Sequence, residues 1–240
     1  MTVMENLAKI FPKNNYDNQD KVLLAVDCII FGFDDDELKL LLIKRNFQPE
    51  KGKWSLMGGF LGMNETLNDA ASRVLNNLTG LNDVYLEQLS VFSDLERDPV
   101  ERTVSVAYFA LINIKKNDKK LIRANSAQWF SLSEVPPLIF DHNEMVQKAI
   151  KQLRYKTSIQ PIGFELLPDK FTMRQLQKLY EAILNQSIDK RNFSKKISQL
   201  DILLKLDEKD TISSKKGAYL YKFDEKKYRQ KAANGFVFKL

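Results

Sequence analysis

The first 155 residues alternate between short apolar runs and polar turns, a pattern that predicts strands. Residues 21–33 form an almost unbroken apolar run rich in β-branched and aromatic side chains, which is typical of a buried strand. An acidic turn at 34–37 and a second apolar run at 38–45 predict a hairpin. Residues 84–92 and the end of 93–114 also predict strands, and 127–136 predict a strand followed by a turn.

Two stretches in the same region carry apolar residues at helical spacing instead. Residues 67–78 place six of them on one face of a helix, namely Leu67, Ala70, Ala71, Val74, Leu75 and Leu78. Residues 139–156 predict a second helix, with Asp141 or Asn143 as its capping residue. Strands that alternate with two helices predict an α/β/α sandwich around a mixed sheet.

The pattern changes after residue 155. Residues 156–170 contain two prolines and one glycine, and we interpret them as a linker. Residues 172–186 predict a helix that begins with a capping box formed by Thr172 and Gln175. The expected organisation is an N-terminal arm (1–20), a first domain (21–155), the linker (156–170) and a second domain (171–240).

A second helix and a hairpin follow in the C-terminal domain. Residues 189–200 place three apolar residues on one face of a helix. Two short apolar runs at 202–206 and 218–223 predict the strands of a hairpin. Helix, short turn, helix and hairpin is the order of elements in a winged helix-turn-helix domain.

Positive charge is concentrated in the second domain. Residues 156–240 carry 18 Lys and Arg against 10 Asp and Glu, a net of +8, and residues 1–155 carry 19 against 21, a net of −2; the two sum to +6. A basic domain after a nearly neutral one favours a polyanionic partner, here double-stranded DNA. A solvated lysine-rich tail would give the same charge, so the predicted helices and hairpin are needed to favour DNA. RNA is disfavoured because we find no motif of stacking aromatic residues.

The helix at 189–200 is expected to lie in the major groove. Its polar face offers lysine and arginine for phosphates and guanine edges, and asparagine for adenine. The alternative is an ordinary surface helix with a lysine-rich face. The residues expected to contact DNA are Lys190, Arg191, Asn192, Lys195 and Lys196 in the helix and Lys215 and Lys216 near the tip of the hairpin.

Composition disfavours several kinds of site and location. The only cysteine, Cys28, excludes an internal disulfide and fits a reducing compartment. The only histidine, His142, disfavours a histidine-based metal site, and we assign it a capping or supporting role. We find no signal peptide and no apolar stretch long enough to span a membrane, so we expect a cytoplasmic protein without a metal or cofactor.

One stretch of the first domain, 59–81, resembles the Nudix box. That motif is glycine, five residues, glutamate, seven residues, and Arg-Glu-aliphatic-any-Glu-Glu-any-Gly-aliphatic. The matching residues are Gly59, Glu65, Arg73, Leu75, Gly80 and Leu81. Three positions differ, because Val74, Asn77 and Leu78 stand where the family has glutamate. An unrelated amphipathic helix would explain the apolar spacing but not the matched glycine and charged positions.

The three missing glutamates bear on activity. Positions 74, 77 and 78 share one helical face, on which the enzymes of the family hold Mg²⁺ against a substrate diphosphate. Valine and leucine offer no oxygen ligand, and asparagine offers one neutral carbonyl. We therefore expect a protein that is not an enzyme. The runner-up is an active hydrolase that uses Glu65 and another carboxylate, such as Glu96.

The resemblance also implies a ligand pocket beside this helix. Asp27 interrupts the first apolar run, and a buried carboxylate is costly unless it is paired or faces a cleft. Gly58 and Gly59 permit a bend and a close approach of the backbone. The residues expected to bind a small polar ligand are Asp27, Lys44, Arg45, Trp54, Gly58, Gly59 and Phe60.

Three further segments, 96–111, 139–145 and 189–196, resemble the Nudix-related transcriptional regulators, in which a degenerate Nudix domain precedes a winged helix-turn-helix. The resemblance implies a homodimeric repressor that a small ligand releases from operator DNA. The most similar branch is the arabinose-responsive regulator of Bacteroidetes, so we expect L-arabinose as the ligand and a role in carbohydrate metabolism. The alternative is an ADP-ribose-sensing regulator of NAD metabolism. A third hypothesis is a sugar- or nucleotide-binding protein whose basic domain contacts another protein.

Overall fold

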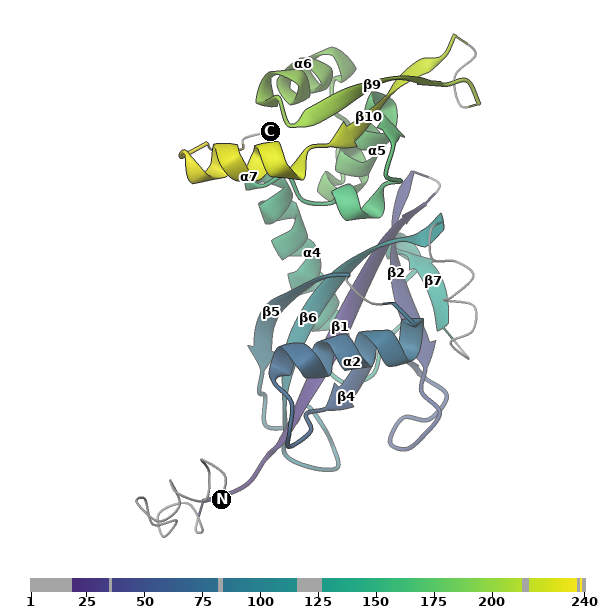
Figure 1. The fold of residues 1–240 in the computed structure, drawn as a ribbon. Coiled ribbons are helices and arrows are strands. Elements are labelled where there is room, and N and C mark those ends of the chain that lie inside the picture. The colour runs from purple at the N-terminus through teal and green to yellow at the C-terminus, as the bar shows by residue number, and fades with distance from the viewer. Residues whose placement is uncertain are drawn as a thin grey trace.

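The structure, a computed structural model, describes residues 19–34, 36–81, 84–115, 127–212, 216–236 and 238, and the side chain of Leu78 lies outside this description. Two domains are stacked one above the other (Figure 1). Most of the expected N-terminal arm, and Lys215, lie outside the described residues. Within the described ranges no helix is long and apolar enough to cross a membrane.

The first domain is built on a mixed sheet. Its central strand β1 (Leu23–Asp34) pairs antiparallel with β2 (Glu37–Lys44) and parallel with β6 (Thr103–Asn113). At one edge, β5 (Tyr85–Phe92) pairs antiparallel with β6. The apolar run of β1 follows from this position, because a central strand covered on both faces has no exposed side.

Three short strands extend this sheet, and a helical turn follows the last of them. β4 (Met57–Phe60) pairs antiparallel with β1, while β3 (Trp54–Ser55) and β7 (Ala127–Ser131) pair antiparallel with β2. β7 leads into one turn of 3-10 helix, η2 (Leu132–Glu134). The sheet therefore brings the segment before the Nudix box directly onto β1.

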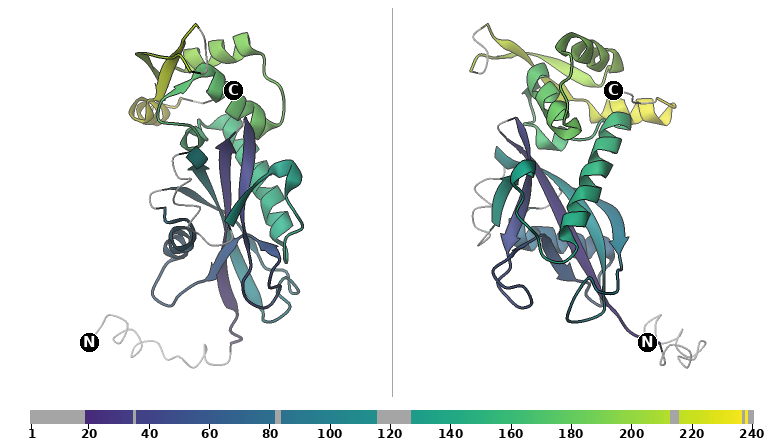
Figure 2. Two further views of the ribbon diagram at one scale, coloured as in Figure 1. Left: turned by 90° about the vertical axis from the view of Figure 1, so that its right-hand side faces the viewer. Right: turned by 180° about the vertical axis from the view of Figure 1, so that it is seen from behind.

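Two helices cover the sheet, one on each face (Figure 2). α2 (Leu67–Thr79) buries its apolar stripe in one cluster with β1 and β6. α4 (His142–Ile159) lies on the opposite face in a second cluster, which continues into the C-terminal domain. The expected α/β/α sandwich with a mixed sheet is confirmed, and the apolar core on the α4 side joins the two domains.

The start of α4 differs from the expectation. Asp141 occupies the N-cap position, as predicted, but its side chain makes no capping hydrogen bond. Arg97 takes up both of its carboxylate oxygens instead. Asn143 lies inside the helix, and α4 runs on to Ile159, so the predicted linker begins within a helix.

The second domain begins with a 3-10 turn, η3 (Phe164–Leu166), and a short strand, β8 (Phe171–Thr172). α5 (Met173–Leu184) starts with the predicted capping box: the backbone N–H of Gln175 donates to Thr172 Oγ1, and the backbone N–H of Thr172 donates to Gln175 Oε1. Two orphan donors of the first turn are thereby satisfied.

A second helix and a hairpin complete this domain. Asp189 caps α6 (Lys190–Leu200) by accepting a hydrogen bond from the backbone N–H of Asn192 at 2.8 Å. β9 (Leu203–Asp210) and β10 (Ala218–Phe223) form a hairpin that pairs with β8. The predicted winged helix-turn-helix order is confirmed.

One further helix, α7 (Glu225–Ala233), was not predicted. It has few apolar residues, so it gave no periodic signal. Lys227 Nζ and Lys231 Nζ lie 2.6 and 3.2 Å from carboxylate oxygens of Asp201, and Lys231 also donates to the carbonyl of Leu200. Polar contacts with the end of α6 therefore help to hold α7 in place.

Candidate functional site

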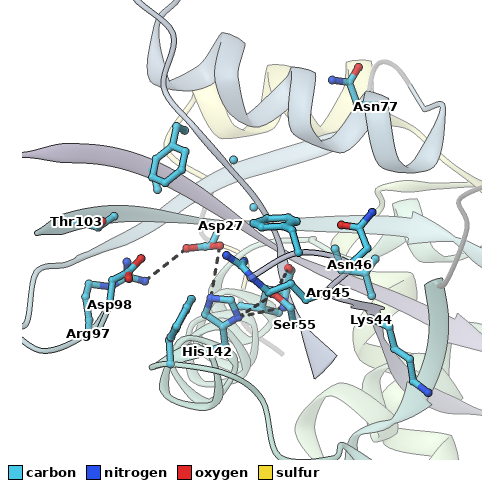
Figure 3. Close-up of a pocket in the computed structure, with 18 residues that line it drawn as sticks. Asp27, Lys44, Arg45, Asn46, Ser55, Asn77, Arg97, Asp98, Thr103 and His142 are labelled. Carbon is cyan, nitrogen blue, oxygen red and sulfur yellow. Dashed lines mark hydrogen bonds and ion pairs between the residues drawn. The ribbon is translucent and has the colours of Figure 1, made fainter. Parts of the chain in front are cut away.

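A cavity of about 480 Å³ opens at one end of the first-domain sheet (Figure 3). Its walls come from β1, the end of β2, β4, the loop between β5 and β6, and the residues around the start of α4. α2 contributes Asn77. Segments far apart in the sequence meet around one space of a size typical of small-molecule sites.

Asp27 is buried in the wall of the cavity, with 6% of the residue exposed. Ser105 donates its hydroxyl to Asp27 Oδ2 at 2.6 Å, and Arg97 Nη2 lies 3.6 Å from the same oxygen. His142 Nε2 lies 3.6 Å from Asp27 Oδ1. These neighbours compensate the buried carboxylate, which would be costly alone. Gly58 pairs with Asp27 across the strands, and a Cβ there would stand 2.2 Å from Asp27 Oδ1, so this approach requires glycine.

His142 is buried beside Asp27. Its Nδ1 accepts a hydrogen bond from the backbone N–H of Leu56 at 3.1 Å, which leaves the proton of the neutral ring on Nε2, facing Asp27. Burial lowers the pKa of His142, although the charge of Asp27 opposes this effect. The geometry is that of a neutral side chain that supports the cavity wall.

Arg97 joins the cavity to the start of α4. Its Nε and Nη2 donate to the two carboxylate oxygens of Asp141, each at 2.9 Å. The side chain of Arg97 is only 3% exposed. Such bidentate, charge-assisted pairs are among the stronger polar contacts in proteins. No local pattern in the sequence indicates this pair, because its members are 44 positions apart.

Arg45 presents a guanidinium to the cavity between two aromatic rings. Its Cζ lies 3.9 Å from the ring centroid of Phe47 and 5.6 Å from that of Phe140. Its buried Nε has no hydrogen-bond partner within the described part of the chain. Because a guanidinium matches the geometry of phosphate oxygens, an anionic ligand group would satisfy it.

Aromatic rings are also exposed at the cavity. Phe47 and Phe60 line it, and each is more than half exposed, at 57% and 56%. Large exposed apolar side chains beside a cavity offer flat surfaces on which a planar ligand group can stack.

The helix of the Nudix box does not offer the ligands that Mg²⁺ needs. Val74 is buried, and Asn77 supplies one amide to the cavity. In the described ranges we find no group of three or more His, Cys, Asp or Glu that could hold a metal ion. This set of donors does not fit Mg²⁺, which prefers several hard oxygen ligands.

Glu65 is already engaged by Arg73 of α2 and by the backbone of its own loop. Arg73 donates Nε to Glu65 Oε2 at 2.8 Å and Nη2 to Oε1 at 2.6 Å, and the backbone N–H of Gly62 donates to Oε1 at 2.6 Å. The hydrogen bonds from Arg73 and then from Gly62 lower the pKa of Glu65 to about 2. The runner-up partner Glu96 is not among the residues that line the cavity. The two carboxylates of the hydrolase hypothesis are not brought together there.

Most of the predicted binding residues do line the cavity, namely Asp27, Lys44, Arg45, Gly58, Gly59 and Phe60. Trp54 does not, because neighbouring residues of a strand point to opposite faces and Ser55 takes the inward position. The Trp54 ring packs against Phe130 with centroids 4.8 Å apart. Lys44 Nζ lies over the Trp54 ring, 5.2 Å from its centroid, and points away from Asp27 (Figure 3).

Several cavity residues were not selected from the sequence. Asn46 and Phe47 directly follow the selected Arg45 in the sequence. This adjacency was the signal that could have indicated that they line the cavity. The fold also brings in residues that no local pattern indicated, namely Arg97, Asp98 and Phe140 from loops and Thr103 from the start of β6.

The second domain carries the candidate nucleic-acid interface. The five α6 residues expected to contact DNA are all exposed, while Phe193 and Ile197 on the other side of the helix are buried. Lys216 is exposed beside the hairpin tip. α6 and the hairpin lie on the side of this domain that faces away from the first domain (Figure 1).

Comparisons with known families match both domains. The NUDIX domain matches residues 21–151, and the NrtR DNA-binding winged helix domain matches residues 163–223.

Two relatives match over a large part of their own length. The chain is 34% identical over 205 residues to the ADPR responsive transcriptional repressor NtrR of Acinetobacter baylyi, a match that covers 84% of this chain and 82% of that protein. It is also 34% identical over 127 residues to an ADP-ribose pyrophosphatase of Methanocaldococcus jannaschii, covering 52% of this chain and 70% of that protein.

Solved structures of NrtR from Shewanella oneidensis are similar as well. The crystal structure of that protein with a 27mer DNA has a TM-score of 0.77 and 29% identity, and the match covers 83% of this chain and 93% of that one. The cocrystal structure of its NUDIX domain with ADP ribose has a TM-score of 0.51 and 32% identity, covering 64% of this chain and 99% of that one.

Proposed function

Because this chain belongs to the Nudix-domain repressors that end in an NrtR-type winged helix, it is a ligand-responsive transcriptional repressor that binds DNA, and we propose that its ligand is ADP-ribose. ADP-ribose bound in the first-domain cavity would release the protein from its operator. The expected L-arabinose and carbohydrate metabolism find no support in the relatives described above. One of those relatives is named for its response to ADPR, and one similar domain was crystallised with ADP ribose.

The observation that carries this proposal is the buried Nε of Arg45 at the cavity, which has no hydrogen-bond partner within the described residues. ADP-ribose brings a diphosphate, whose oxygens match a guanidinium, and a planar adenine. Phe47 and Phe60 offer exposed rings for the adenine. A neutral pentose would offer neither an anion for Arg45 nor a planar ring for the phenylalanines.

The loss of the metal-binding carboxylates fits sensing rather than hydrolysis. Val74 and Asn77 carry no charge, so this part of α2 does not repel a diphosphate. It also offers no carboxylate to hold a metal ion that would activate water. The ligand would therefore be bound intact and leave unchanged. Its effect on DNA binding would come from the difference in its affinity for two arrangements of the domains.

A second candidate function is hydrolysis of ADP-ribose, and the relative from Methanocaldococcus jannaschii favours it. The set of donors at the cavity argues against it. Release of ribose 5-phosphate from ADP-ribose in the presence of Mg²⁺ would establish it. A third hypothesis, in which the basic domain contacts another protein, predicts binding that responds weakly to salt, whereas DNA affinity falls steeply with salt.

We further propose that the repressor acts as a homodimer. The exposed polar face of α6 would enter the major groove, with Lys216, and Lys215 by sequence, near the phosphates. Two such helices would meet half-sites about 34–36 Å apart. Light scattering on the free protein and on its DNA complex tests this assembly.

The direct test of the ligand is calorimetry with the full chain. ADP-ribose and L-arabinose are titrated separately, and AMP serves as a ligand that keeps the adenine but lacks the diphosphate. The proposal expects saturable binding of ADP-ribose, weaker binding of AMP and none of arabinose. Binding of arabinose alone would reject it.

A further inference from the structure

α4 runs from the sheet of the first domain to the DNA-binding domain (Figures 1 and 2). His142, in its first turn, lines the cavity. Towards its other end, Arg154 donates Nε–H to the carbonyl of Ile183 in the last turn of α5 at 2.9 Å, and Leu153 is buried in the cluster that includes Ile183. At 18 residues α4 is roughly 27 Å long and rigid. A shift of its first turn therefore reaches α5.

The first turn of α4 is held from outside the helix. The carboxylate of Asp141 makes no capping bond and is bound by Arg97. Just before it, the backbone of Phe140 has a φ of 51°, in the left-handed region that residues other than glycine rarely adopt. The backbone N–H of Ile139 donates to the carbonyl of Trp54 at 3.1 Å. The turn before α4 is thus a strained segment that its neighbours hold in place.

Arg97 stands between this turn and the cavity. It lines the cavity, and its Nη2 lies 3.6 Å from Asp27 Oδ2. The carboxylate of Asp141 binds the edge of the Arg97 guanidinium that Nε and Nη2 form. The planar guanidinium has further N–H groups, so an anionic ligand can engage Arg97 while the pair with Asp141 persists. A movement of Arg97 towards such a ligand would carry Asp141, and with it the start of α4.

We propose that Arg97 and Asp141 are the positioning pair through which occupancy of the cavity moves α4 and so changes DNA affinity. This inference rests on the proposed release of DNA by ADP-ribose. Neither residue is required to touch DNA. Asp141 is separated from the cavity by Arg97, so its role is to transmit rather than to bind.

The test compares Asp141→Asn with a matched control, Glu144→Gln. Asn keeps the size of the side chain but replaces the charged, bidentate acceptor. Glu144 carries an exposed carboxylate in the same first turn of α4, but it does not line the cavity. The readout is the coupling factor, the ratio of the DNA Kd with saturating ADP-ribose to the DNA Kd without it. A residue that only stabilises the fold would change the melting temperature and leave this ratio intact.

Wild-type protein should show a coupling factor within the range of about 5–150 that is typical of allosteric proteins. Asp141→Asn should bind ADP-ribose nearly as well as wild type, with a coupling factor close to 1. Glu144→Gln should keep the wild-type factor. If Asp141→Asn does not fold, Arg97→Lys tests the same link, because a lysine keeps the charge but cannot bind both oxygens in one plane; its coupling factor should also approach 1.

Two results would overturn the inference. One is an unchanged coupling factor in whichever of these two variants folds, and the other is an equal loss of coupling in Glu144→Gln. Failure of the proposed function is a different result, since wild-type protein itself would then keep its DNA in saturating ADP-ribose.

Discussion

The guanidinium carbon of Arg45 lies 3.9 Å from the ring centroid of Phe47, at the wall of a cavity in which Arg45 Nε has no hydrogen-bond partner within the described residues. A buried hydrogen-bond donor without a partner raises the free energy of the unliganded protein. A ligand that accepts this hydrogen bond removes that cost and therefore binds more tightly. The pair therefore marks the part of the cavity where the diphosphate of the proposed ligand should lie.

Replacing Arg45 tests this assignment. Arg45→Gln should weaken ADP-ribose binding by about tenfold to a hundredfold, because a hydrogen bond to a charged group contributes about 1.5–3 kcal/mol. DNA affinity without ligand should stay unchanged. Calorimetry and a gel shift measure the two quantities. Lys44→Gln is the matched control, because the Lys44 ammonium lies over Trp54; an equal loss in this variant would contradict the assignment.

The α6 interface can be tested through salt. Lys190→Ala combined with Arg191→Ala should abolish operator binding at physiological salt and leave ADP-ribose binding intact. At low salt, the slope of log affinity against log salt should fall by about 1 for each lost phosphate contact. Lys151→Ala removes an exposed cation from α4 in the first domain and serves as the control. An unchanged gel shift in the double variant would contradict the assignment of α6.

Glu65 predicts a specific dependence of stability on pH. Hydrogen bonds from Arg73 and Gly62 lower its pKa in the folded protein from 4.5 to about 2. A lowered pKa of an acid contributes stability above the unfolded value of 4.5, and this contribution is lost as pH falls from 4.5 towards 2. Urea unfolding of wild type and Glu65→Gln should therefore differ at pH 6, differ less at pH 3 and converge near pH 2. A difference that stays constant with pH would show that Glu65 is not linked in this way.

Restoring the lost carboxylates should not restore an enzyme. Val74 is buried, and its Cγ2 would lie 2.9 Å from a Cβ at Gly59, so Val74→Glu places a carboxylate in a crowded apolar setting. We expect its free energy of unfolding to fall by about 1–3 kcal/mol, the usual cost of an unsatisfied buried polar group. Asn77→Glu, at an exposed position, should cost little. Urea unfolding measures both, and full ADP-ribose hydrolysis by the variant with Glu at 74, 77 and 78 would contradict this view.

The elements that the sequence predicted well are those with local signals. α2 and α5 have apolar stripes and capping boxes within a few residues, and α6 has its own capping aspartate. α7 has no apolar stripe and is held partly by ion pairs with Asp201, which no local pattern reveals. The order of elements followed from periodicity and from family resemblance together.

The cavity was only partly predictable, for physical reasons. Gly58 and Asp27 could be selected because a glycine pair and a charge in an apolar run are visible in the sequence. Trp54 was misplaced because a two-residue strand does not reveal which of its side chains faces inward. The ion pair of Arg97 with Asp141 was missed because only the folded chain brings a loop to the start of α4.

The central claim is that ADP-ribose, bound in the first domain, releases this repressor from DNA. The most direct measurement is fluorescence anisotropy with labelled duplexes tiled across the region upstream of the protein's own operon. ADP-ribose is titrated into the bound complex, and L-arabinose is titrated in parallel. We predict tight binding to one duplex, release by ADP-ribose and no response to arabinose. A complex that arabinose dissociates while ADP-ribose leaves it intact would contradict the account.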